Sequence, residues 1–209
     1  MDMDKVLKFK VGIEGLEDKI WREIEITDRR TVADLAYTIL ATFDSLAYHL
    51  YNIKYKDYTF DCFGCTEIDE NAIDATITKL SVLGLETNDE LEMEYDYGST
   101  TTFKITYIGE RNMSEFEGYL YPNIVDGAGR GMLDDMCDFE LKEIVEDTDR
   151  KGYSDYYVTP EYEKHEKYAY RKFNLKENNK KSKGLVLEIK KWLRSWVIND
   201  FLGVLVSNY

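Results

Sequence analysis

The feature that most constrains the fold is a period-two alternation of apolar and polar residues in four segments. Residues 5–13 and 20–26 alternate in this way, and so do residues 91–97 and 102–108. Successive side chains of a strand point to opposite faces of the sheet, so each segment is typical of a strand with one buried face. A short glycine-containing loop separates the members of each pair. The pattern therefore predicts two β-hairpins.

Helical spacing follows the first hairpin. Thr27 and Asp28 offer N-cap chemistry, and the apolar residues after them recur three and four positions apart. A helix should therefore follow and lie across the hairpin, and further strands are predicted at residues 48–55 and 58–63, with a short helix at 138–147. The expected fold is α+β, with a mixed, mainly antiparallel sheet of successive hairpins, a crossing helix in a β-grasp-like arrangement, and C-terminal helices. The apolar helical positions are Val32, Leu35, Ala36, Ile39, Leu40 and Phe43.

The end of the chain carries an amphipathic pattern. From residue 184 onward, apolar side chains recur near i, i+3, i+4 and i+7, with basic side chains between them. Trp192 and Trp196 give this pattern an aromatic stripe. We expect residues 1–182 to form one domain and residues 183–209 to form a helical extension that packs on or beside it. Alternatively, the stripe binds a protein partner or a second copy of the chain.

The formal charge of −14 is unevenly distributed along the chain. Residues 1–170 carry 18 basic and 38 acidic side chains, a net charge of −20, whereas residues 171–194 carry nine basic and two acidic ones. An acidic body repels nucleic-acid phosphates, so we expect nucleic-acid contact only through the basic residues 171–194. The explanation that the sequence favours is that the surface charge serves solubility.

Compartment signals point to the cytoplasm. No segment approaches the roughly 18 uninterrupted apolar residues of a membrane span, and the first residues lack the basic and then apolar pattern of a signal peptide. The three cysteines are an odd number, which favours reduced thiols over a disulfide framework. We therefore expect a cytoplasmic protein that makes no membrane contact.

Cys62 and Cys65 have the C-x-x-C spacing that can present two thiolates to zinc or form a redox pair. A structural zinc site needs four ligands, and Cys137, His49 and His165 lie in unrelated settings. The spacing is better explained by small residues at a strand end and turn. We predict no metal and no cofactor.

Three polar residues are candidates for acid–base or metal chemistry. His49 follows a predicted helix and opens a predicted strand, and it could act as a general base or a ligand. Asp96 and Asp135 could form a carboxylate pair if the hairpin turn meets the glycine-rich segment 126–135. The alternative, which the sequence favours, is that Asp96 accepts backbone N–H groups in its turn and that Asp135 caps the helix at 138–147.

The glycine-rich sequence GAGRG at residues 127–131 could cradle an anion through its backbone N–H groups. Its spacing matches neither common nucleotide-binding motif, and aspartates flank it, so nucleotide binding is not predicted. No catalytic residue is assigned. The candidate binding residues are His49, Tyr51, Asp96, Tyr97, Arg130, Asp135, Trp192 and Trp196.

Four stretches occur in a specific order: WREIEI before TVADLAYTILATF, then HLYNI, then LETNDELEMEYDYG with FKI, and finally DGAGRGMLDD with RKFNLKENN. In this order they resemble the plasmid pRiA4b ORF-3-like family over most of residues 5–182. Family members usually carry a second aspartate and a tryptophan after the hairpin turn, where Ser99 and Thr101 stand here. The resemblance implies a small prokaryotic or mobile-element protein with an α+β domain, and it implies no general activity.

Three functions remain open. The first is a non-enzymatic protein-binding or adaptor protein of a mobile element or prophage, which is favoured because no complete catalytic constellation accompanies the aromatic C-terminal stripe. The second is an acidic nucleic-acid mimic that inhibits a nucleic-acid-binding enzyme. The third is a metal-dependent hydrolase that uses Asp96, Asp135 and His49.

Overall fold

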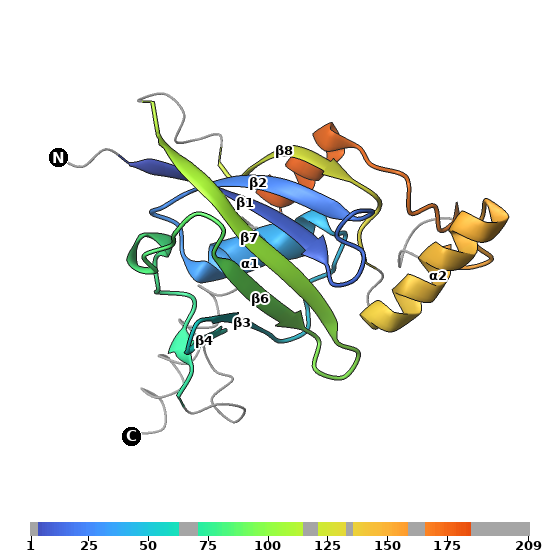
Figure 1. Cartoon of the computed structure of the whole chain (residues 1–209), viewed down its shortest axis with the longest axis horizontal. Coiled ribbons are helices and arrows are strands. Elements are labelled where there is room, and N and C mark those ends of the chain that lie inside the picture. Colours follow the sequence, from blue (N-terminus) through green and yellow to red (C-terminus); the bar gives the residue numbers. More distant parts are fainter. Residues whose placement is uncertain (1–3, 63–70, 115–120, 133–135, 159–165, 185–209) are drawn as a thin grey trace, which may run out of the picture.

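The structure, a computed structural model, describes residues 4–62, 71–114, 121–132, 136–158 and 166–184 (Figure 1). Its fold is α+β, as predicted, with one large mixed sheet and helices beside it. Among the described residues, no helix is long and apolar enough to cross a membrane.

The sheet has eight strands in the order β5-β4-β3-β6-β7-β1-β2-β8. Neighbouring strands are antiparallel, except that β4 and β5 are parallel. The two predicted hairpins are confirmed as β1–β2 and β6–β7, and they lie side by side through the β1–β7 pairing. The strands are β1 (Lys5–Ile13), β2 (Trp21–Thr27), β3 (Tyr51–Tyr55), β4 (Tyr58–Asp61), β5 (Ile73–Asp74), β6 (Glu90–Tyr95), β7 (Thr101–Asn112) and β8 (Asn123–Ala128).

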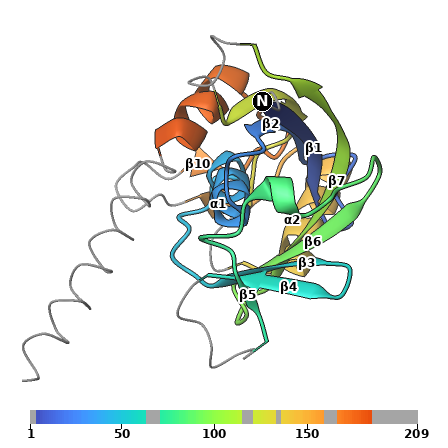
Figure 2. The same ribbon diagram turned by 90° about the vertical axis from the view of Figure 1, so that its left-hand side faces the viewer.

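The longer helices are α1 (Val32–Thr42) and α2 (Asp138–Lys151). The structure also has a short 3-10 helix, η1 (Leu80–Val82), and a helical segment at residues 175–184. Figure 2 shows α1 and the 175–184 helix on the same side of the sheet. A small separate sheet pairs β9 (Tyr157–Val158) with β10 (Glu166–Lys167). The β-grasp-like arrangement and the crossing of the sheet by α1 stay predictions.

The start of α1 differs from the prediction. Its N-cap is Thr31, whose side chain accepts a hydrogen bond from the Asp34 backbone N–H at 3.1 Å. The Asp34 carboxylate accepts in return from the Thr31 backbone N–H at 3.2 Å, which completes a capping box. Thr27 instead ends β2, where it pairs with Val6 of β1, so it is part of the sheet rather than the cap.

The core lies between α1 and the inward face of the sheet. All the apolar positions predicted for α1 are buried, and so are the inward residues of the central strands. Cross-strand partners such as Leu91 with Ile105 and Met93 with Phe103 bring apolar side chains directly opposite each other. Each such side chain contributes about 1.5–3 kcal/mol when it is fully buried. The alternation in the sequence therefore marks the buried face correctly.

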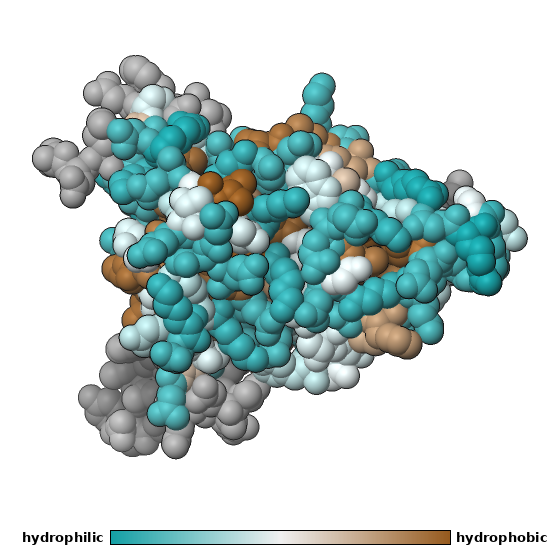
Figure 3. Space-filling model, in the orientation of Figure 1, coloured by the Kyte–Doolittle hydropathy of each residue, from teal (hydrophilic) through white to brown (hydrophobic). Residues whose placement is uncertain are grey.

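The opposite face of the sheet is polar (Figure 3). Lys8 forms an ion pair with Glu23, and Lys104 forms one with Glu92. These pairs join neighbouring strands on the face away from α1, so positive and negative charges alternate there. The face is therefore a mixed-charge surface and not a continuous array of carboxylates.

Several element boundaries differ from the predictions. The polar segment after β4 contains the edge strand β5, whose two residues are too few to show a period-two pattern. Helix α2 continues to Lys151, beyond the predicted end at 147, and stops at Gly152, whose φ of 84° is left-handed. The first three residues of the predicted glycine-rich loop belong to β8. The predicted strand at 58–63 is confirmed as β4 as far as Asp61, Cys62 lies outside the strand, and residue 63 falls outside the described residues.

Candidate functional site

The structure brings His49 and Asp96 together where β3 begins and β6 ends. The distance between His49 Nε2 and Asp96 Oδ2 is 3.6 Å. The Asp96 backbone N–H donates to the Leu50 carbonyl at 2.9 Å, so the segment before β3 is tied to the hairpin turn after β6. The His49 ring lies 4.2 Å from the ring of Tyr48 and meets the ring of Tyr95 edge-on, with centroids 5.8 Å apart. The imidazole is therefore held by two aromatic rings and one carboxylate.

Asp96 has the structural role that the sequence favoured. Its φ is 58°, in the left-handed region that aspartate tolerates in turns. Its Oδ1 accepts a hydrogen bond from the Gly98 backbone N–H at 3.0 Å. One carboxylate oxygen therefore stabilises the turn, while the other faces His49.

Tyr97 does not lie where the alternation predicts. The strand pattern places it on the core face after Tyr95, but the left-handed residue between them redirects the chain. Tyr97 is 37% exposed, and its hydroxyl accepts a hydrogen bond from Asn52 Nδ2 at 3.2 Å. Tyr51, by contrast, is only 1% exposed, because it belongs to the core and packs edge-on against the ring of Tyr37. Of these two candidate binding residues, only Tyr97 reaches the surface.

Glu94 completes the polar surroundings of Tyr97. Asn52 Nδ2 donates to its carboxylate at 2.9 Å, and Lys54 Nζ lies 2.9 Å from its other oxygen. The hydrogen bond from Asn52, followed by the contact with Lys54, lowers the pKa of Glu94. Glu94 is therefore a charged acceptor at neutral pH and not a proton donor.

An exposed apolar surface adjoins the His49–Asp96 contact. We name it the Tyr48 patch and define it as Leu46, Tyr48, Leu50 and Tyr97, whose exposed fractions are 60%, 54%, 42% and 37%. Leu50 is hydrogen-bonded through its backbone to Asp96, the residue before Tyr97, so the patch joins two segments. Several large apolar side chains exposed in adjoining segments are typical of interaction surfaces. The sequence reasoning missed Leu46, Tyr48 and Leu50, although their L-x-Y-x-L spacing lies between a helix and a strand.

The glycine-rich segment serves close packing. A Cβ added at Gly131 would lie 1.9 Å from the carbonyl oxygen of Phe43, and one at Gly129 would lie 2.5 Å from that of Lys19. Next to Gly131, the Met132 backbone N–H donates to the same Phe43 oxygen at 2.7 Å. These glycines are needed because the backbone passes directly against other backbone.

The anion beside this loop is the chain's own Asp44. The Gly131 backbone N–H donates to one Asp44 oxygen at 3.4 Å, and Lys181 Nζ donates to the other at 2.6 Å. Burial opposes the charge on Lys181, but the hydrogen bond to Asp44 and its negative charge raise the pKa of this amine overall. A carboxylate of the same chain therefore accepts the hydrogen bond that Gly131 could offer to a bound anion.

A buried arginine organises the same region. Arg22 is 1% exposed, and its guanidinium lies 4.7 Å from the ring centroids of both Phe43 and Phe173. It donates to the backbone carbonyls of Thr42 at 3.0 Å and Ala128 at 2.6 Å. Burial lowers the pKa of Arg22 to about 10. This value is still well above 7, so the guanidinium is charged at neutral pH. The arginine thus joins α1, β8 and the segment that carries Phe173.

The remaining candidates are not brought to the Tyr48 patch by any described contact. The guanidinium of Arg130 lies 5.8 Å from the ring of Tyr168. Cys137, and not Asp135, is the N-cap of α2 because Glu140 accepts from its backbone N–H at 3.3 Å. Three other candidate positions, Asp135, Trp192 and Trp196, fall outside the described residues, as does Cys65 of the C-x-x-C spacing.

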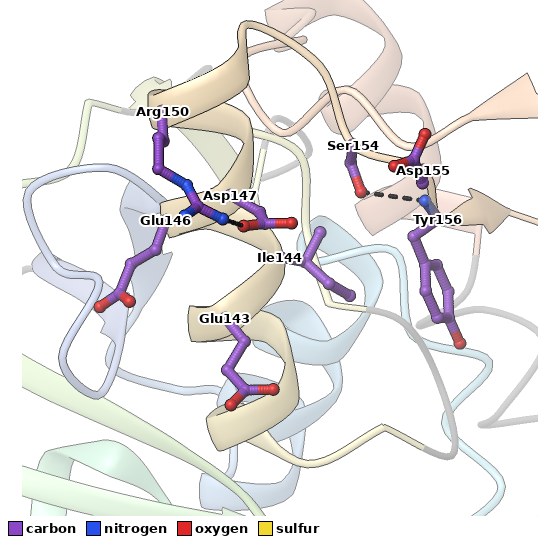
Figure 4. Close-up of a pocket in the computed structure, with 8 residues that line it drawn as sticks. All are labelled: Glu143, Ile144, Glu146, Asp147, Arg150, Ser154, Asp155 and Tyr156. Atoms are coloured by element: carbon purple, nitrogen blue, oxygen red, sulfur yellow. Dashed lines mark hydrogen bonds and ion pairs between the residues drawn. The ribbon is translucent and has the colours of Figure 1, made fainter.

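A separate hollow of about 750 Å³ lies between α2 and the segment after it (Figure 4). Ile144 points toward Tyr156 across the gap, while Asp147 pairs with Arg150 along the helix. The backbone N–H of Tyr156 donates to the Ser154 hydroxyl at 3.1 Å. The other lining residues are Glu143, Glu146 and Asp155, so the hollow is mainly acidic and contains none of the predicted site residues.

Within the part of the chain that the structure describes, no group of three or more His, Cys, Asp or Glu side chains could hold a metal ion. His49 and Asp96 are two potential ligands, fewer than the three protein ligands of a typical catalytic zinc site.

The family model described as plasmid pRiA4b ORF-3-like protein matches residues 5–181. No curated protein matches the chain. Among solved structures, the crystal structure of MM3350, a protein of unknown function from Methanosarcina mazei Go1, is similar to this chain with a TM-score of 0.61. The two are 23% identical, and the match covers 71% of this chain and 83% of that chain. At this identity the likeness concerns the fold alone.

Proposed function

The chain belongs to the plasmid pRiA4b ORF-3-like family, and from that premise we propose that it is a cytoplasmic, non-enzymatic protein-binding or adaptor protein of a mobile element or prophage. The plasmid in the family's description supports the link with a mobile element. The proposed mode of action is contact between the Tyr48 patch and another protein.

The observation that carries this proposal is the exposure of four large side chains in two segments that a backbone hydrogen bond joins. Leu46 and Tyr48 each expose more than half of their surface, although the chain has an extensive core available to bury them. Removing apolar area of this kind from water is worth about 25 cal/mol per Å². Aromatic and aliphatic side chains surrounded by polar groups are also the usual composition of the centre of a protein interface.

The contacts of His49 support binding more than catalysis. Its described neighbours are the rings of Tyr48 and Tyr95 and the carboxylate of Asp96. These neighbours fix the orientation of a surface imidazole, whereas nucleophilic catalysis needs a hydroxyl or thiol held against the base. The Asp96 oxygen that faces away from His49 is already bonded to Gly98.

The acidic-mimic alternative has weaker support. It requires a surface whose carboxylates imitate a row of phosphates. The polar face of the sheet instead alternates in sign, with Lys8 against Glu23 and Lys104 against Glu92. Pairs of this kind cancel much of the field that would attract a basic groove.

The proposal is tested by placing a photo-crosslinking residue at Tyr48 and identifying what it captures in cells. We expect one protein to be captured reproducibly and its yield to fall when Leu46 or Leu50 is changed to serine. Ile77→Ser is the matched control, because Ile77 is another exposed aliphatic residue, at 75% exposure, outside the patch. Equal capture by the patch variants and the control would refute the proposal.

A further inference from the structure

The helical segment 175–184 is firmly attached to the domain. Asn179 donates from Nδ2 to the Ile124 carbonyl at 2.8 Å and accepts from the Ile124 backbone N–H at 2.9 Å. Ser182 is fully buried one turn later. These contacts fix the position and direction of the chain as it reaches residue 184.

The chain reaches residue 184 close to the Tyr48 patch. Lys181 Nζ lies 2.6 Å from an oxygen of Asp44, which precedes Leu46 of the patch by two residues. Lys181 is only three residues before Gly184, where the described helix ends. The remaining 25 residues of the chain therefore begin beside this surface.

The length of this remaining segment is sufficient to cover the patch. A helix rises about 1.5 Å per residue, so 25 residues in helical form would extend about 37 Å. The patch itself spans only residues 46–50 and the neighbouring turn at Tyr97.

The chemistry of the segment also fits the patch. Its sequence pattern predicts a stripe of Leu185, Ile189, Trp192 and Trp196 along one helical face. Lys190, Lys191 and Arg194 lie between the apolar positions, and the border of the patch carries the carboxylates of Asp44 and Asp96. An apolar stripe with basic flanks is therefore complementary in chemistry to an apolar surface with an acidic border.

We propose that residues 185–209 dock on the Tyr48 patch of their own chain in the free protein. The docked segment would compete with an external protein for the same surface, so partner access would require its displacement. The competition, but not the docking, rests on the function proposed above. Intramolecular docking needs no second molecule, because attachment of helix 175–184 keeps the local concentration of the segment high.

Tryptophan fluorescence tests this docking in the full chain without any partner. Replacing Trp21 by phenylalanine leaves Trp192 and Trp196 as the tryptophan reporters. We expect their emission in the purified chain to be blue-shifted, and their quenching by acrylamide to be weaker, relative to the urea-unfolded chain. Both readings should be independent of protein concentration.

The decisive comparison uses the double variant Leu46→Ser/Tyr48→Ser, with Ile77→Ser/Val82→Ser as the control. The control removes two aliphatic side chains that are 75% and 70% exposed outside the patch. We expect the patch variant to shift the emission and quenching toward the unfolded values, and the control to leave them unchanged, with far-ultraviolet circular dichroism confirming that both are folded.

Three results would overturn the proposal. The first is tryptophan emission that already equals that of the unfolded chain, and the second is a folded patch variant with unchanged emission. The third is shielding that disappears on dilution, which would assign the patch to a second copy of the chain. Because no partner is present, this test can fail while crosslinking at Tyr48 still succeeds, so the two proposals are distinguishable.

Discussion

Gly131→Ala should destabilise the fold strongly, because the residue lies against the backbone that follows α1. An added methyl group would lie 1.9 Å from the Phe43 carbonyl oxygen. Real Cβ atoms essentially never approach another atom within 3.0 Å, so the two backbones would have to separate by about an ångström. Neither backbone is a flexible side-chain end that could move aside cheaply.

The separation would also break hydrogen bonds that Gly131 and its neighbour Met132 make. The Met132 N–H donates to the Phe43 oxygen at 2.7 Å, and the Tyr168 hydroxyl donates to the Gly131 carbonyl at 3.0 Å. Each lost bond costs about 1 kcal/mol, and overpacking costs about 1–3 kcal/mol. We therefore expect the free energy of unfolding to fall by about 3–5 kcal/mol.

Urea unfolding followed by circular dichroism measures this change. Gly98→Ala is the matched control, because its added Cβ would meet Asp96 Oδ1 at 3.4 Å, an ordinary contact. A loss below about 1 kcal/mol for Gly131→Ala, the usual size for a surface change, would refute the packing explanation. The segment would then have room to open, as an anion-binding loop requires.

Three further predictions concern capping and ionisation. Thr31→Ala should lower the free energy of unfolding by about 1 kcal/mol, measured in urea, because the capping box is lost. Folding lowers the pKa of Glu94, so its ionised carboxylate stabilises the fold above the unfolded-state pKa of 4.5, and this contribution is lost as the pH falls through the folded-state pKa. Glu94→Gln should therefore be less stable than the parent at pH 7 and equally stable in acid. Urea unfolding at several pH values measures the difference. Burial raises the pKa of Tyr107 from 10.0 to about 12, so its contribution is present below pH 10 and is lost as the pH rises through about 12. Tyr107→Phe should therefore lose less stability than the parent across that interval, and a parallel loss in both proteins would contradict the assignment.

The sheet was predictable from the sequence to the extent that one face is buried. The alternation in residues 5–13 and 102–108 reports which side chains point into the core, and the structure confirms both strands. The alternation does not predict features that depend on a very short strand or on the backbone conformation of a single residue. Edge strand β5 has only two residues, and the left-handed Asp96 turns Tyr97 out of the alternating face.

The sequence identified some residues of the candidate site, but it did not predict that they lie together on one surface. The hydrolase hypothesis grouped His49 and Asp96 with Asp135, but the contact between His49 and Asp96 depends on the pairing of β3 with β6, which joins segments more than 40 residues apart. Local patterns do not specify such pairing. Leu46 and Leu50 were missed for a related reason, since only the three-dimensional structure shows that they stay exposed.

The contact between Asn179 and Ile124 has a consequence for where this domain can be shortened. The amide of Asn179 occupies both backbone groups of a residue in outermost strand β8, as a neighbouring strand would. Truncation before this asparagine would leave those groups open to intermolecular pairing, a known route to aggregation. The family match continues two residues past it, to 181. A shortened form of the domain should therefore retain helix 175–184, which keeps the edge of β8 from pairing with another molecule.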